Sequence, residues 1–311
     1  MKKRMKRKTG KGVNQKKIDM DLTILAIPGI ILLLIFNYMP MGGLVIAFKN
    51  YVYSKGIFGS EWNGLENFKF FFTSQDAWRI TRNTVGYGVL FIVLGIVTGV
   101  GLALMLYEVR SRRALKIYQT SMILPSFLSW VIIGYITYIF LNTNEGVINR
   151  ILLSLGFEKV EWYNDPKYWP FILSIVRVWQ SIGMGSLVYY ASLMGIDTEI
   201  LEAAQIDGAT KGQQIIHILI PELSSVICIM LIMNMGTVIK GDFGLFYQIP
   251  RDIGVLYPAT DIIDTYVFRG VRNSNFSISA AVGFFQSFVG LFMVVITNHI
   301  VAKIEPDNAM F

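Results

Sequence analysis

Six long apolar runs constrain this chain more than any other feature of its sequence. The clearest are Thr84–Tyr107 and Ile117–Leu141, which contain no charged residue. A helix needs about 20 apolar residues to cross roughly 30 Å of hydrocarbon. The other four runs are Leu22–Phe48, Tyr168–Gly195, Ser224–Phe246 and Ser279–Val301. With 53% hydrophobic residues and a mean hydropathy of +0.51, the sequence predicts an all-α membrane protein with six transmembrane helices.

The placement of basic residues predicts which way these helices cross the membrane. The net charge is +7, and lysines and arginines gather in the tail before residue 22 and in the loop 108–116 after the second run. Cytoplasmic loops carry such an excess, so both segments are predicted to be cytoplasmic. Six spans then put both termini in the cytoplasm. We interpret the basic tail as a topology signal and expect no nucleic-acid binding. The first run is too long for a signal peptide and no small-residue cleavage site follows it.

The segment between the fourth and fifth runs, residues 197–221, is polar and is predicted to lie in the cytoplasm. Asp197 or Thr198 can cap a short helix, and Gly208 can adopt the left-handed conformation that ends one. A second amphipathic piece carries Ile215, Ile218 and Leu219 before Pro221 stops it. The pattern predicts a helix–turn–helix held between two membrane spans.

This segment resembles the signature loop of ABC-importer permeases, which reads EAA…DGA…I…P. The matching residues are Glu202, Ala203, Ala204, Asp207, Gly208, Ala209, Ile218 and Pro221. Ile215 stands where the family commonly has Phe, which keeps an apolar contact but changes its shape. The alternative interpretation is a generic amphipathic hairpin between two spans.

The resemblance implies a type I ABC importer (MetI-like) permease fold and a set of partners. These are a second, homologous permease subunit, two cytosolic ABC ATPase subunits and an extracellular solute-binding protein. The segment 241–278 is similar to the polysaccharide or oligosaccharide permease branch, which implies a carbohydrate substrate. Gly10-Lys11-Gly12 lacks the rest of a Walker A pattern. ATP and Mg are therefore expected on the ATPase subunits, with no cofactor on this chain.

Polar side chains at helical spacing in the last three runs predict a substrate path. Three such faces pointing together would line a hydrated route, whereas the alternative is hydrogen bonding within a dry bundle. An arginine inside a span normally faces water or a partner. The candidate path residues are Arg177, Gln180, Ser181, Tyr189, Asn234, Thr237 and Gln286. Glycines at 95 and 99 are expected to allow close helix packing, and Pro125 is expected to kink the third span.

The predicted organisation is a chain embedded in the bacterial cytoplasmic membrane as a multi-pass protein in contact with lipid. Its parts are a basic tail (1–21), a first transmembrane helix (22–48), an outer segment (49–82), a permease core (83–303) with a coupling loop (197–221), and a C-terminal tail (304–311). No catalytic or metal-binding group is expected, since Cys228 is the only cysteine and His217 and His299 are isolated. Two alternatives stay open: an ion-coupled secondary transporter and a non-transporting membrane scaffold.

Overall fold

The computed structural model describes residues 20–304, so the predicted tails lie almost wholly outside the described residues. The chain divides into two units at residue 45. The first unit holds α1 (Met20–Leu33), which continues into a π-helical turn (Leu34–Tyr38) and a 3-10 helix that runs on to Phe48. Residues 24–48 are long and apolar enough to cross a membrane. Their large hydrophobic side chains are mostly exposed in the isolated chain, as a lipid-facing span requires.

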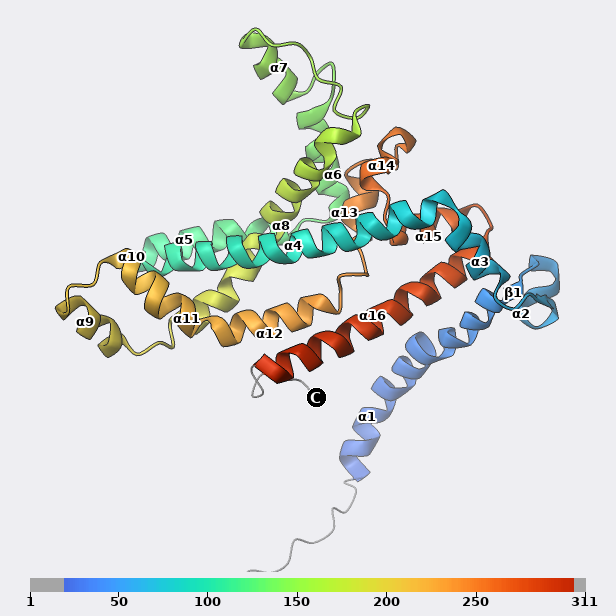
Figure 1. The fold of residues 1–311 in the computed structure, drawn as a ribbon, viewed down its shortest axis with the longest axis horizontal. Helices are drawn as coiled ribbons and strands as arrows, with labels where there is room; N and C mark the ends of the chain where they lie inside the picture. The colour runs from blue at the N-terminus through green and yellow to red at the C-terminus, as the bar shows by residue number, and fades with distance from the viewer. Residues whose placement is uncertain (1–19, 305–311) are drawn as a thin grey trace, which may run out of the picture. The chain divides into compact units, whose positions relative to one another are not determined.

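The second unit contains three further long helices, namely α4 (Gln75–Tyr107), α8 (Trp169–Leu193) and α16 (Phe276–Ile304), drawn in Figure 1. The other elements are β1 (Lys49–Asn50), α2 (Gly56–Gly59), β2 (Glu61–Trp62), α3 (Glu66–Thr73), α5 (Arg112–Ile123), α6 (Trp130–Leu141), α7 (Val147–Ser154), α9 (Thr198–Ile206), α10 (Lys211–Gln214), α11 (Ile220–Glu222), α12 (Ser224–Met235), α13 (Phe243–Gln248), α14 (Tyr257–Thr260) and α15 (Ile263–Arg272).

The third predicted span, Ile117–Leu141, is not one helix. Within the described residues, four helices could each cross a membrane, or up to six spans if two bent pairs count as one span each. One of those pairs joins α5 to α6 with a bend of 99°. Pro125 lies in a 3-10 turn there, and the Ser129 hydroxyl accepts the N–H of Ile132 at 3.4 Å to start α6. The break falls at the predicted proline, but it is far sharper than a kink.

The prediction of a continuous fifth span over Ser224–Phe246 is wrong. Helix α12 ends at Met235, and α13 begins only at Phe243. Gly236 is the C-cap of α12, and the Asp242 carboxylate caps α13 by accepting the N–H of Leu245 at 3.2 Å. Two glycines and an Asp cap favour separate short helices over one long helix.

The predicted outer segment (49–82) consists of several short elements and the start of α4. Strands β1 and β2 form a small antiparallel pair with Lys49 opposite Trp62, and α3 follows. Helix α4 then starts at Gln75, nine positions before the apolar run, because the Ser74 hydroxyl accepts the N–H of Ala77 at 3.3 Å. Hydropathy alone did not predict the β1–β2 pair or the early start of α4. The strand residues carry no clear apolar alternation, and the first turns of α4 are polar.

A buried ion network holds the segment between α13 and the end of α15 to the start of α4. The Asp261 carboxylate is fully buried and pairs with Arg79 at 3.1 Å and Arg269 at 2.6 Å. The Asn83 side-chain amide donates to the Asp261 carbonyl at 2.9 Å. A buried charge persists only when it is paired and hydrogen-bonded. This network therefore fixes the N-terminal turns of α4 against α14 and α15.

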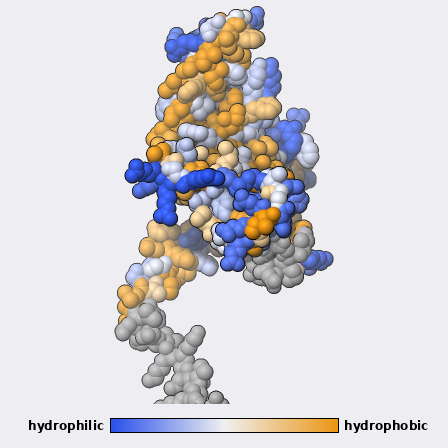
Figure 2. Space-filling view, turned by 90° about the vertical axis from the view of Figure 1, so that its left-hand side faces the viewer, coloured by the Kyte–Doolittle hydropathy of each residue, from blue (hydrophilic) through white to orange (hydrophobic). Residues whose placement is uncertain are grey.

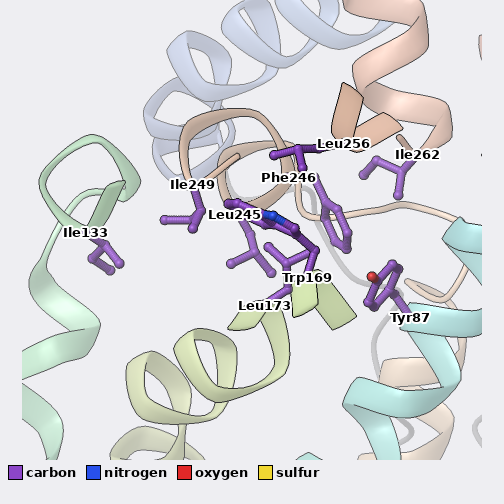
Figure 3. Close-up of a cluster of buried hydrophobic side chains, with 9 residues drawn as sticks. All are labelled: Tyr87, Ile133, Trp169, Leu173, Leu245, Phe246, Ile249, Leu256 and Ile262. Atoms are coloured by element: carbon purple, nitrogen blue, oxygen red, sulfur yellow. The ribbon is translucent and has the colours of Figure 1, made fainter. Parts of the chain in front are cut away.

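The largest helix contact joins α4 and α8, and small residues make it possible. A Cβ on Gly99 would lie 3.0 Å from the Tyr189 ring, so the close packing predicted at this glycine is confirmed. A Cβ on Gly95 would meet nothing within 4 Å, so packing does not explain that glycine. Farther along, Tyr87, Trp169 and Phe246 meet in a buried cluster that joins α4, α6, α8 and α13 (Figure 3).

Hydrophilic and hydrophobic residues gather in different regions of one face of the molecule. Seen from the side where α9 and α10 lie in Figure 1, hydrophilic residues gather across the middle of the face and hydrophobic residues cover much of the region above them (Figure 2). Exposed apolar side chains on one surface need an apolar environment. This distribution fits a protein surrounded by lipid.

Candidate coupling loop and translocation cavity

The coupling loop (residues 197–221) begins with a capped helix. Asp197, rather than Thr198, caps α9, because its carboxylate accepts the N–H of Glu199 at 3.0 Å. Glu202 and Ala203 lie exposed on this helix, and Ala204 is half-buried. Ile206 at its end is 86% exposed. A large aliphatic side chain held out on a capped, polar helix is a suitable anchor for a protein partner.

The turn after α9 is fully hydrogen-bonded around Gly208. Gly208 has φ +84°, its N–H donates to the Gln205 carbonyl at 3.1 Å, and the Ala209 N–H donates to the Ala204 carbonyl at 2.9 Å. This pair of bonds is the Schellman arrangement, which requires a left-handed residue and favours glycine. The left-handed conformation of Gly208 and these two backbone hydrogen bonds therefore define the turn, and the predicted left-handed conformation is confirmed.

The second half of the loop is also capped. Thr210 and Gln213 form a reciprocal capping box, with the Thr210 N–H donating to the Gln213 side chain at 2.7 Å. The helix then widens into a π turn over Ile215–Leu219 and continues through Pro221 to Glu222. Pro221 was predicted to stop this helix, but it sits in the first turn of α11, where a missing N–H is tolerated. The break comes at Leu223, where the chain bends by 54° into α12.

The residues matched to the signature loop, together with Ile215, divide into an exposed set and a half-buried set. The exposed set consists of Glu202, Ala203, Asp207, Gly208 and Pro221, and the half-buried set consists of Ala204, Ala209, Ile215 and Ile218. A shallow hollow of about 330 Å³ lies between the two halves and is lined in part by Asp207, Gly208, Ala209 and Ile218. The loop thus offers a preformed surface rather than a flexible strand.

The coupling loop is tied to the membrane helices by packing and by charge. Leu219 and Leu223 are buried in a cluster with Ala103, Tyr189 and Leu193, and Ile215 packs against it. At the end of α4, the Glu108 carboxylate pairs with the Lys211 ammonium at 3.2 Å. That pair is exposed and adds little stability, so the apolar cluster is the main attachment.

A cavity of about 230 Å³ lies between α4, α8 and the segment 230–242. Five of the predicted path residues line it, namely Arg177, Ser181, Tyr189, Asn234 and Thr237. The cavity wall also includes apolar and aromatic side chains such as Phe91 and Phe246. Mixed apolar and polar walls are typical of sites for organic ligands.

Several polar groups of the cavity already bond within the protein. The Arg177 guanidinium pairs with Asp242 at 3.0 Å. The Ser181 hydroxyl donates to the Arg177 carbonyl at 2.8 Å, and the Asn234 amide donates to the Met230 carbonyl at 2.6 Å. These bonds keep the arginine and the helix ends in place, and they leave other lone pairs and N–H groups able to face the cavity.

Two predicted path residues are not brought to this cavity. Gln180 lies on α8 but is not among the lining residues. Gln286 on α16 donates to the Ile239 carbonyl at 2.8 Å and to the Asp264 carboxylate at 3.0 Å. Burial raises the pKa of the Asp264 carboxyl, although the Gly241 N–H and the Gln286 amide both donate to it. Gln286 therefore braces the unwound segment after α12 in this structure.

Known proteins share this architecture. Residues 91–306 match the family described as "Binding-protein-dependent transport system inner membrane component". The chain belongs to this family. Protein LplB of Bacillus subtilis (strain 168) is 34% identical over 303 residues, covering 96% of this chain and 95% of that protein. The polygalacturonan/rhamnogalacturonan transport system permease protein YteP of the same organism is 33% identical, covering 92% and 89%.

A solved structure of similar fold strengthens the match. A chain in the structure of a bacterial ABC transporter involved in the import of the acidic polysaccharide alginate superimposes with a TM-score of 0.85. The two chains are 32% identical, and the alignment covers 93% of this permease and 97% of that chain. The family consists of transport components of the membrane, not enzymes. Among residues 20–304 no group of three or more His, Cys, Asp or Glu side chains could hold a metal ion.

The sequence predictions missed part of the cavity wall in this permease. Asp242, Lys240 and Tyr87 line the cavity together with the predicted residues. Asp242 and Lys240 lie between α12 and α13, where the sequence predicted a continuous helix. The two glycines that flank the unwound segment, Gly236 and Gly241, are the signal that could have revealed it.

Proposed function

We propose that this permease is the membrane-spanning subunit of an ATP-driven importer for an oligosaccharide or polysaccharide fragment. Its relatives include proteins named for the transport of polygalacturonan, rhamnogalacturonan and arabinooligosaccharides. Six spans, each bent pair counting as one, would place both termini and the coupling loop in the cytoplasm. The membrane would be the cytoplasmic membrane of a bacterium.

The complete importer would contain four further subunits. A second, homologous permease would close the translocation path, and two cytosolic ABC ATPase subunits would bind ATP and Mg. An extracellular solute-binding protein would deliver the sugar, as the neighbour structure with alginate pentasaccharide-bound periplasmic protein suggests for its own system. The roles of the loop residues Glu202 to Pro221 and of the cavity residues are part of this proposal.

One observation supports the proposed mechanism most directly. Tyr189 belongs both to the wall of the cavity and to the buried cluster that holds Leu219 and Leu223. Packed interiors transmit displacement because they leave few voids. A push on the coupling loop would therefore reach the cavity through the apolar cluster and the side chain of Tyr189.

The energy for the switch would come from the ATPases. Moving two states from about 1:99 to 99:1 requires roughly 5.5 kcal/mol of differential binding. Closure of the ATPases on ATP would press on α9 and the turn at Gly208. The two caps and the Schellman turn would keep the loop stiff enough to pass that force to α8 and α12.

Reconstitution of the complete importer in liposomes tests this proposal. We expect carbohydrate accumulation that requires ATP, the ATPases and the binding protein together. An ion-coupled transporter would instead accumulate sugar from an ion gradient with no ATPase present. A scaffold would transport nothing in either experiment.

A further inference from the structure

An unusual backbone turn lies at Arg251 and Asp252, outside the cavity and the coupling loop. Both residues have positive φ, 60° and 51°, and neither is glycine. The left-handed conformation costs about 1–2 kcal/mol for each such residue. It persists only where the surrounding structure holds it, and such strain gathers at binding sites.

The residues on either side hold this turn in place. Ile249 and Leu256 are fully buried in the cluster of Figure 3. The Asp252 carboxylate accepts the Tyr257 hydroxyl at 3.0 Å and pairs with Arg269 at 3.3 Å. Asp252 is therefore committed to the fold, and the turn has little freedom to relax.

Arg251 takes no part in that network. It is exposed, and its guanidinium lies over the Tyr138 ring, 4.2 Å from the centroid. Among residues 20–304 it forms no ion pair with a carboxylate. The fold thus stabilises a strained turn that places the Arg251 guanidinium, which has no carboxylate partner there, against the ring of Tyr138.

Two openings meet at Arg251. One, of about 370 Å³, is lined in part by Tyr138, Asn142, Asn144 and Tyr163. The other, of about 230 Å³, is lined in part by Tyr135, Tyr247 and Gln248. The first has the size at the lower end of ordinary ligand sites, about 300 Å³ and above. Tyrosine rings and side-chain amides surround the guanidinium on both sides.

This set of groups matches a sugar that carries a carboxylate. A guanidinium binds a carboxylate through two parallel N–H donors. Aromatic rings pack against the apolar face of a sugar ring, and amides bond to its hydroxyls. We propose that Arg251, Tyr138 and Tyr163 form a subsite for a uronate residue of the imported oligosaccharide. This inference rests on the proposed carbohydrate import and names the class of sugar.

A carboxylate on the surface of the binding protein is the competing occupant. A flat protein contact has no need of rings and amides on two sides of one cation, whereas a polyhydroxylated sugar uses all of them. The concave lining therefore favours the sugar.

Paired substrates test the subsite. The reconstituted importer is given a uronate oligosaccharide and the same oligosaccharide after its carboxyl groups are reduced to alcohols. We expect Arg251→Gln to lower the ratio of uronate to neutral uptake (each as kcat/KM) about tenfold, the effect of losing one charge-assisted pair. Arg251→Lys keeps the positive charge but loses the two parallel N–H donors, so it should lower the ratio less. Lys159→Gln removes an exposed positive charge elsewhere on the outer loops and should leave the ratio unchanged.

Four results would overturn the subsite. An unchanged ratio in Arg251→Gln would show that the guanidinium does not read the carboxylate. A rise in the concentration of binding protein needed for half-maximal uptake, equal for both sugars, would assign Arg251 to protein docking. Uptake of only the neutral sugar by the unmodified importer would reject the subsite and leave carbohydrate import standing, whereas uptake of neither would reject both.

Discussion

Replacing Gly208 with alanine changes the coupling loop at its most constrained point. Gly208 has φ +84°, and a Cβ built there would meet nothing within 4 Å. The substitution therefore causes no clash, and its whole effect comes from forcing an L-residue into the left-handed region. Gly212, four residues on, is also exposed and without neighbours around a Cβ, but it lies inside α10 with no positive φ. The same Gly→Ala change can thus be compared in a left-handed and in a helical backbone conformation.

The expected magnitude follows from the backbone alone. A left-handed L-residue costs about 1–2 kcal/mol, which is a factor of roughly 5–30 in the ratio of the ordered turn to a disordered one. Gly208→Ala should weaken the turn by this factor, and Gly208→Val should do so more because valine is β-branched. Gly208→Asn should be milder, since asparagine tolerates this conformation. Gly212→Ala should be neutral or slightly stabilising, because alanine is the better helix former.

The assay is sugar uptake per ATP hydrolysed by the reconstituted importer. We expect Gly208→Ala and Gly208→Val to be made and inserted normally, with uptake per ATP reduced by about the same factor of 5–30. Gly212→Ala should behave like the unmodified protein. Normal uptake per ATP in Gly208→Val, or an equal loss in Gly212→Ala, would refute the idea that the left-handed turn transmits force.

Three further predictions follow from the packing and the cavity. Gly99→Val should destabilise the purified protein by about 1–3 kcal/mol through overpacking against Tyr189, while Gly95→Ala should not; equal thermal midpoints would contradict the packing account. Asp264→Asn keeps an acceptor oxygen for the Gly241 N–H and the Gln286 amide, so its thermal unfolding should be close to normal. Asp264→Leu removes that acceptor and should lower the free energy of unfolding by about 1–3 kcal/mol. Similar midpoints for the two variants would count against these hydrogen bonds. Asn234→Ala should lower kcat/KM for sugar several-fold, and adding Gln180→Ala should change it little further, so unchanged uptake in the double variant would mean that both residues only pack.

Hydropathy located the long apolar helices better than it predicted helix continuity. The apolar run from Ser224 to Phe246 stays hydrophobic through the point where α12 ends, because an unwound backbone buried in protein can carry the same side chains. Only Gly236, Gly241 and the capping Asp242 mark the interruption. The start of α4 shows the reverse case, since its first turns are polar and carry no hydropathy signal.

Local turn chemistry was more predictable than contacts distant in sequence. Asp197 or Thr198, and Gly208, were identified as helix end signals because capping depends on neighbours within four residues. The Arg177–Asp242 pair joins residues 65 positions apart, and nothing in the sequence links them. Gln286 shows the same limit: its spacing on α16 suggested a path, but its amide reaches Ile239 and Asp264.

We propose that the coupling loop carries force from a cytosolic ATPase to the cavity. In a Cys228→Ser background, Ile206→Cys places a single reactive thiol at the exposed end of α9. We expect a crosslink between this thiol and a cysteine in a surface groove of the ATPase, with uptake abolished on crosslinking and restored on reduction. Labelling of this residue only from outside the cell, or full uptake while the crosslink is intact, would contradict the account.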